Sequence, residues 1–158
     1  MFHQYPELSK YEYKTTQRIK DILTSYNIKM IDIPMETGLV AEIGQGEKCI
    51  AVRTDIDALP IQEQVSQDFT STNDEVMHAC GHDIHMASIL AIATKLKEEE
   101  EQLNGRVRFL FQPAEELGYG AKVMAKTNAL DDVQAIIGFH NYPTLDIGEF
   151  AIKSGPIT

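Results

Sequence analysis

A short segment near the middle of the chain concentrates side chains that bind metals. Residues 78–85 contain three histidines, a cysteine and an aspartate, although the whole chain of 158 residues has only five histidines and two cysteines. Neutral imidazole and thiolate are preferred ligands of zinc and similar divalent metals. The segment therefore predicts one wall of a metal site. The alternative is a buried, unreactive cysteine beside surface histidines.

Cys80 and His82 form the most promising ligand pair in this segment. Gly81 between them allows the backbone to turn, so that both side chains can face one ion. Asp83 and His85 are candidates for further ligands or for partners of a ligating histidine, whose other ring nitrogen usually needs a carboxylate or a carbonyl. Cys80 as a catalytic nucleophile is the alternative role, and it requires a base at hydrogen-bond distance.

Two adjacent glutamates, Glu115 and Glu116, follow Pro113 in a second polar segment. Neighbouring residues in an irregular turn point in different directions, so one can bind metal while the other faces water and substrate. A hydrolytic metal site needs both a ligand and a base. The alternative is the acidic first turn of a helix, which the helix dipole favours.

Composition narrows the class of protein. Lys and Arg total 14 against 24 Asp and Glu, a formal charge of −10, which disfavours binding to nucleic acid. The apolar fraction of 43% is enough for a core. Two cysteines do not make a disulfide scaffold, and neither a membrane span nor a signal peptide is visible. We expect a cytoplasmic protein of one domain that does not bind membranes.

The hydrophobic pattern alternates between helical and strand periods. In chain order it predicts a helix over 11–26, a hairpin of 38–43 and 49–53 with its turn at 44–46, a helix after Asp83, a strand over 107–111, a short helix over 121–126, a strand over 135–139 covered on both faces, and a final strand over 148–152. This order predicts an α/β layered domain with a mixed sheet.

In such sheets, functional residues gather beyond the carboxyl ends of the strands. Each candidate follows a predicted strand. Asp55 and Asp57 follow the strand over 49–53, Glu115 and Glu116 follow the strand over 107–111, and His140 follows the strand over 135–139. We therefore expect these segments and the histidine-rich segment to converge on one rim. Asp55 and Asp57 are predicted either to support ligands or to cap a turn.

Five stretches of the sequence, in this order, resemble a family of di-metal amidohydrolases. That family includes N-acyl-amino-acid hydrolases, hippurate hydrolase, N-acetyldiaminopimelate deacetylase and plant auxin-conjugate hydrolases. The stretches are 3–9 (HQYPELS), 53–60 (RTDIDALP), 78–83 (HACGHD), 111–116 (FQPAEE) and 138–140 (GFH). Together they cover essentially the whole chain, and their combination is far more specific than any one of them.

The resemblance implies a role for each matching residue. Cys80, His82, Glu116 and His140 would be ligands of two divalent metal ions, zinc or manganese, with cobalt or nickel as further possibilities. Glu115 would be the general base that takes a proton from the attacking water and passes it to the leaving amine. The substrates implied are small N-acyl amino acids or dipeptides, and the full-length form is expected to be a homo-oligomer.

The chain also departs from that family's pattern. Family members begin earlier, continue beyond Thr158 into a lid domain, and supply one more metal-ligating histidine. The resemblance therefore implies that residues 1–158 are the amino-terminal portion of an incomplete αβα catalytic domain, with the lid domain absent. We expect the isolated chain to be weakly active or inactive.

One other function class stays open, and two are excluded by residue spacing. A truncated, inactive fragment that still binds metal is the main alternative. A zinc nucleobase deaminase needs His-x-Glu and Pro-Cys-x-x-Cys, and a zinc protease of the other common type needs His-Glu-x-x-His. The sequence contains none of these patterns.

Overall fold

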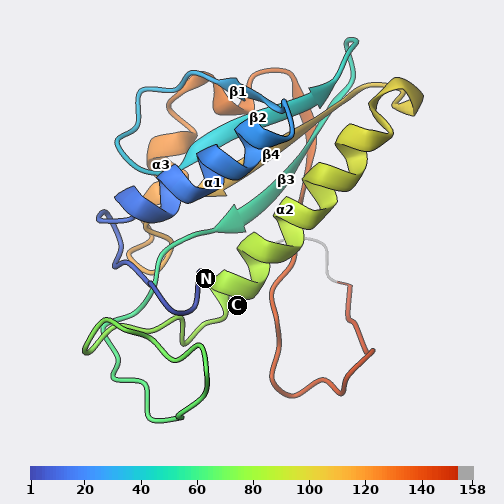
Figure 1. The fold of residues 1–158 in the computed structure, drawn as a ribbon. Helices are drawn as coiled ribbons and strands as arrows, with labels where there is room; N and C mark the ends of the chain where they lie inside the picture. Colours follow the sequence, from blue (N-terminus) through green and yellow to red (C-terminus); the bar gives the residue numbers. More distant parts are fainter. Residues whose placement is uncertain (153–158) are drawn as a thin grey trace.

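A computed structural model describes residues 1–152 of the chain. Over these residues the fold is a five-stranded mixed sheet between helices (Figure 1). The elements are α1 (Tyr13–Ser25), β1 (Lys29–Ile31), β2 (Leu39–Gly44), β3 (Cys49–Asp55), α2 (His82–Glu98), β4 (Arg106–Gln112), α3 (Gly120–Met124) and β5 (Val133–Gly138), with 3₁₀ turns at Glu100–Gln102 and Asn128–Leu130. None of the helices in this part of the chain is both long and apolar enough to cross a membrane.

The sheet order is β1-β2-β4-β3-β5, which contradicts the predicted hairpin. The two predicted hairpin strands form as β2 and β3, but β4 lies between them, antiparallel to β2 and parallel to β3. The reason is burial. Every residue of β4 after Arg106 is buried, so this strand stabilises the fold most in the centre of the sheet. A pattern of alternating residues identifies strands but does not identify their neighbours.

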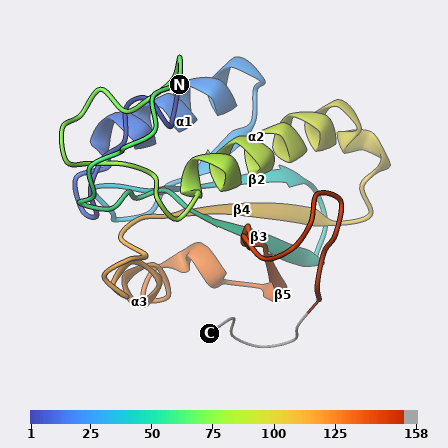
Figure 2. The same cartoon turned by 90° about the horizontal axis from the view of Figure 1, so that it is seen from below.

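Helices cover both faces of the sheet, as the predicted αβα layering requires. Figure 2 shows α1 and α2 on one side of the sheet and α3 on the other. The larger core lies under α1 and α2, where Ile19 and Met86 meet Phe109 and Phe111 of β4. A smaller core lies under α3 and is built around Leu110 and Met124. Adjacent β4 residues thus face opposite cores, as in a central strand.

Two predictions near the end of the described chain are wrong. The apolar run 135–139 forms β5, but within residues 1–152 β5 is an edge strand that pairs with β3 alone. Ile136 and Ile137 are 53% and 56% exposed instead of covered. Residues 148–152, predicted as a strand, have no regular structure. An apolar run is equally compatible with an edge strand and a central one, because its sequence does not encode what lies beside it.

The parallel strands bring the candidate residues together. Because β3 is parallel to both β4 and β5, the carboxyl ends of all three lie at one edge of the sheet. α2 begins at His82, and its first turn lies near the same edge (Figure 1). The loops after β3, β4 and β5 and the turn before α2 therefore meet there, as predicted.

Candidate metal centre

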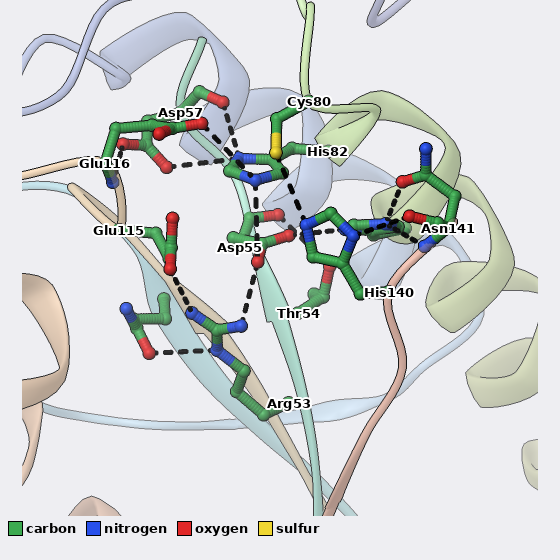
Figure 3. Close-up of polar contacts among 12 residues, drawn as sticks. Arg53, Thr54, Asp55, Asp57, Cys80, His82, Glu115, Glu116, His140 and Asn141 are labelled. Atoms are coloured by element: carbon green, nitrogen blue, oxygen red, sulfur yellow. Dashed lines mark hydrogen bonds and ion pairs between the residues drawn. The ribbon is translucent and has the colours of Figure 1, made fainter. Parts of the chain in front are cut away.

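The four predicted ligands converge from three segments of the chain. Cys80 and His82 flank the start of α2, Glu116 follows β4 and His140 follows β5 (Figure 3). Cys80 Sγ lies 3.3 Å from His140 Nε2, and His82 Nε2 lies 3.7 Å from Glu116 Oε1. Below, "ligand cluster" means these four residues. The structure brings them together, while their role as ligands stays a prediction.

His82 is the centre of the cluster. It belongs to three groups of residues whose possible metal-binding atoms lie within 4.8 Å of one another. Its companions in these groups are Cys80 with His140, Glu115 with Glu116, and Asp55 with His85. Its ring Nδ1 donates to the main-chain oxygen of Asp57 at 2.9 Å. That hydrogen bond fixes the tautomer and leaves a lone pair on Nε2 that faces the other donors.

The turn that holds Cys80 and His82 needs glycine at its middle position. Gly81 has φ +78°, a left-handed conformation that L side chains rarely adopt. A Cβ there would lie 2.5 Å from Asn141 Oδ1, so Asn141 fills the space that a side chain would occupy. The local sequence Cys-Gly-His thus places both ligands on one side of the turn.

Two buried polar atoms show that the cluster fits a cation. Among the described residues, His82 Nε2 and Glu116 Oε1 are buried and have no hydrogen-bond partner. Leaving such groups unpaired is unfavourable, and buried polar atoms in native proteins are nearly always satisfied. Both are electron-pair donors, and they lie on the same cluster as a thiol and a second imidazole. One divalent ion between them would satisfy both atoms, so the residues present fit a metal site.

Asp57 holds Glu116 and His82 in place. Asp57 Oδ2 accepts hydrogen bonds from Ser9 Oγ at 2.6 Å and from the main-chain N–H of Glu116 at 3.0 Å. Burial would raise the pKa of Asp57, but the hydrogen bonds from His82, Ser9 and Glu116 outweigh it and lower that pKa. Asp57 therefore contacts two of the predicted ligands, and its role as their support stays a prediction.

The charges around the cluster favour the binding of a cation. Burial would raise the pKa of Asp55, but the hydrogen bond from His85 and the charges of His82 and Arg53 lower it to about 2. Burial and the carboxylates of Glu116, Glu115 and Asp55 raise the pKa of Cys80 to about 11. Burial also raises the pKa of Glu116. The negative groups repel one another here, and a bound cation would relieve that repulsion.

Glu115 lies at the open side of the cluster. Its side chain is 38% exposed against 21% for Glu116. The Arg53 guanidinium lies 4.0 Å from Glu115 and donates to Asp55 Oδ2 at 2.8 Å and to Gln112 Oε1 at 2.9 Å (Figure 3). The two glutamates therefore differ in environment, as an assignment of one ligand and one base requires.

Three residues in the site had no assigned role from sequence. Arg53 lies in the 53–60 stretch, and its position two residues before Asp55 on the same strand is the signal that could have identified it. Asn141 contacts His85, and the signal there is its place directly after His140. Thr54 is also buried beside Asp55, where its hydroxyl donates to the main-chain oxygen of Asp55.

The expectation that Asp83 could ligate or support the metal is wrong, while that for His85 is partly met. Asp83 points away from the cluster and bonds His3 Nδ1 at 2.8 Å, and His3 Nε2 bonds Glu63 at 2.9 Å. On a helix, residue 83 lies about 100° around the axis from residue 82, so the two cannot share a face. His85, three positions after His82, does face the site and bonds Asp55.

Comparisons with known proteins identify the family of this chain. Residues 51–155 match Peptidase family M20/M25/M40. Over 158 residues the chain is 47% identical to N-acetylcysteine deacetylase of Bacillus subtilis (strain 168), covering 98% of this chain and 42% of that protein. This chain therefore spans less than half the length of the curated relatives that it matches.

Solved structures give the same result. The YXEP protein of Bacillus subtilis, named as a dinuclear metal binding peptidase from the M20 family, has a TM-score of 0.94 and 47% identity, covering 98% of this chain and 44% of that one. A putative aminohydrolase from methicillin resistant Staphylococcus aureus has a TM-score of 0.89 and 37% identity, covering 94% of this chain and 40% of that one. The family match extends over most of the chain and includes every residue of the ligand cluster. The chain belongs to Peptidase family M20/M25/M40.

Proposed function

We propose that this chain forms the metal-binding part of a hydrolase that cleaves the amide bond of N-acyl amino acids or small peptides. The observation that carries the proposal is the pair of buried, unpartnered atoms, His82 Nε2 and Glu116 Oε1, beside Cys80 and His140. The relatives named as an N-acetylcysteine deacetylase and as a dinuclear metal binding peptidase support the reaction class and the metal.

In this proposal Cys80, His82, Glu116 and His140 hold two divalent ions. The charges support that number. With Cys80 as thiolate, the site carries five negative groups, the others being Asp55, Asp57, Glu115 and Glu116, against one guanidinium, Arg53. Two divalent cations would balance the remaining charge. The thiolate favours zinc by its softness, and manganese, cobalt and nickel remain compatible with imidazole and carboxylate donors.

The bound metals would polarise the substrate carbonyl and lower the pKa of a water molecule. Glu115 takes a proton from the attacking water and donates it to the nitrogen of the leaving amine. It is suited to this because it is the more exposed of the two glutamates and Arg53 lies beside it. Asp57 keeps His82 oriented, so that the ring nitrogen of His82 that faces the site carries a lone pair, and Asp55 holds the ring of His85.

The test is hydrolysis of a panel of N-acyl amino acids by the zinc- or manganese-loaded chain, measured as release of free amine. Glu115→Gln should abolish turnover, with a loss of at least about 100-fold, and leave bound metal unchanged because the ligands remain. Glu101→Gln, a change at an exposed glutamate beyond the end of α2 opposite to His82, is the matched control and should retain turnover. Turnover that persists in Glu115→Gln would show that Glu115 is not the base.

A second candidate is a segment that binds metal without turnover. Two observations favour it: the chain spans 42% of the length of its deacetylase relative, and β5 leaves an open apolar edge in the described part of the sheet. Stoichiometric metal binding with no release of amine from any substrate would support it. On that view residues 1–158 are the amino-terminal portion of a catalytic domain. Homo-oligomer formation and a cytoplasmic location stay predictions.

A further inference from the structure

His140 is the least anchored member of the ligand cluster. It follows the edge strand β5, and residues 138–150 are all exposed. A metal ligand must nevertheless be held within a few tenths of an ångström of its working position. Burial does not provide that restraint for His140, so its contacts must.

Asn141 provides the first of these contacts. Its main-chain oxygen accepts a hydrogen bond from His140 Nδ1 at 2.7 Å, which leaves His140 Nε2 free toward Cys80. Its main-chain N lies 3.0 Å and its side-chain Oδ1 2.6 Å from His85 Nε2, so Asn141 donates to that nitrogen when it is unprotonated and accepts from it when it is protonated. One residue thus joins the ring of His140 to the ring of His85.

His85 transmits this contact to the rigid part of the fold. It is fully buried on α2, and its Nδ1 donates to Asp55 Oδ1, at the end of β3, at 2.7 Å. Its ring centroid lies 4.6 Å from that of His140. Asp55, His85 and Asn141 therefore form a continuous chain of contacts from β3 through α2 to the segment after β5. Figure 3 labels Asp55 and Asn141, the two ends of this chain of contacts.

The same asparagine also contacts the turn that carries the other ligands. Its side-chain amide occupies the place where a Cβ of Gly81 would lie, with Oδ1 only 2.5 Å from that position. Gly81 separates Cys80 from His82. Asn141 therefore contacts both His85, whose ring lies beside that of His140, and the turn that holds Cys80 and His82.

From this geometry we infer that Asn141 and His85 are positioning residues that fix the approach of His140 to Cys80 and His82. The inference rests on the proposed metal site. Neither residue would bind the metal. Contacts to residues that orient metal ligands are typically worth about 10- to 100-fold in metal affinity.

The experiment is a titration of the chain with Co²⁺ alone, read by absorption. The thiolate-to-cobalt charge-transfer band reports Cys80, and the visible d–d bands report the number and geometry of all donors. Asn141→Ala keeps the main-chain contacts to His140 and His85 but removes the side-chain contacts to His85 and to the turn at Gly81. It should keep the Cys80 band, bind Co²⁺ about 10-fold more weakly, and change the d–d bands, because His140 loses part of its restraint. His85→Gln, a second break in the same chain of contacts, should change the d–d bands in the same way.

A control variant separates positioning from a general loss of stability. Asn73→Ala removes an amide that donates to Pro6 in a remote loop, and it should leave cobalt affinity unchanged. A loss of cobalt affinity in Asn73→Ala equal to that in Asn141→Ala would count against the inference.

The inference and the proposed function fail differently. Parent affinity and parent spectrum in Asn141→Ala, in a chain where His140→Ala changes both, would overturn the positioning role and leave the metal site standing. A parent chain that binds no Co²⁺ at all would overturn both.

Discussion

Cys80 lies where a proton and a metal ion compete for one sulfur atom. Burial and three nearby carboxylates raise the pKa of its thiol to about 11, so the metal-free site keeps the proton at neutral pH. A divalent cation reverses this balance, because it stabilises the thiolate and neutralises the carboxylates together. The residue is thus a poor nucleophile without metal, which argues against the alternative role of Cys80 as a catalytic nucleophile.

This competition predicts that metal binding releases a proton from Cys80. Between pH 6 and 8, zinc affinity should rise by about tenfold for each pH unit from this thiol, since one proton leaves for each site filled. Affinity rises with pH because the raised pKa keeps a proton on Cys80 in the metal-free chain, and that proton must leave when the metal binds. Calorimetric titration in buffers of different ionisation enthalpy measures the number released. Cys80→Ser should release about one proton fewer, and an unchanged number would contradict the assignment.

For individual residues, the sequence was a better guide to which residue types could do chemistry than to which residues contact one another. The side chains of the ligand cluster and Glu115 could be selected because thiol, imidazole and adjacent carboxylates are rare and chemically distinctive. Asp83 was a wrong candidate because its position on the helix, one residue after His82, turns it toward His3. Arg53 and Asn141 received no role because a common polar residue has a function only through neighbours that the fold supplies.

At the scale of elements, the turn before α2 is the most demanding piece of local structure. Its left-handed Gly81 separates two ligands, and the amide of Asn141 lies directly against it. Gly118 also has a positive φ, +57°, but an added Cβ there would meet nothing within 4 Å. Alanine at either glycine would strain the backbone, but only alanine at Gly81 would also clash with a neighbouring side chain. Comparing the two substitutions therefore separates backbone strain from the steric effect at the site.

We predict that Gly81→Ala costs about 1–3 kcal/mol in free energy of unfolding, from the left-handed backbone and the clash with Asn141. It should also weaken Co²⁺ binding, because Asn141 must move. Gly118→Ala should cost about 1 kcal/mol from the backbone alone and leave cobalt affinity unchanged. Urea unfolding and cobalt titration of both variants check this. Equal cobalt affinity in the two variants would contradict the role of the turn.

The elements themselves were largely predictable, and their arrangement was not. The helical stripe from Met86 to Leu96 and the alternation around Phe109 predicted α2 and β4. The hairpin was wrong because neighbouring strands in sequence need not be neighbours in a sheet, and β4 occupies the central position between β2 and β3. β1, with three residues, is too short to give a periodic signal.

At the scale of the whole molecule, the parallel strands β3, β4 and β5 bring segments that are distant in sequence together at one site. Asp55 at the end of β3 is a buried charge of the site, and it bonds both Arg53 and His85. The site and the fold therefore share interactions. Loss of the charge on Asp55 should weaken both together.

Acid should destabilise the metal-free chain through Asp55. Its pKa is lowered from 3.8 to about 2, so the stabilisation is complete above about pH 4 and is lost as the pH falls through 2. The shift corresponds to roughly 2 kcal/mol. Urea unfolding with a chelator present, between pH 5 and pH 2, measures it. Asp55→Asn should make the free energy of unfolding less dependent on pH. Asp68→Asn, at an exposed position, should leave the pH dependence unchanged. An equally steep pH dependence in Asp55→Asn would refute the assignment.

The most direct test of the whole account is X-ray absorption at the zinc edge of the zinc-loaded chain. The account predicts a sulfur neighbour at about 2.3 Å together with nitrogen and oxygen neighbours at about 2.0–2.2 Å. The sulfur shell should disappear in Cys80→Ser, since Cys49 is buried within the sheet and remote from the ligand cluster. A spectrum with only oxygen neighbours in the parent chain, or a sulfur shell that persists in Cys80→Ser, would contradict the proposed metal site.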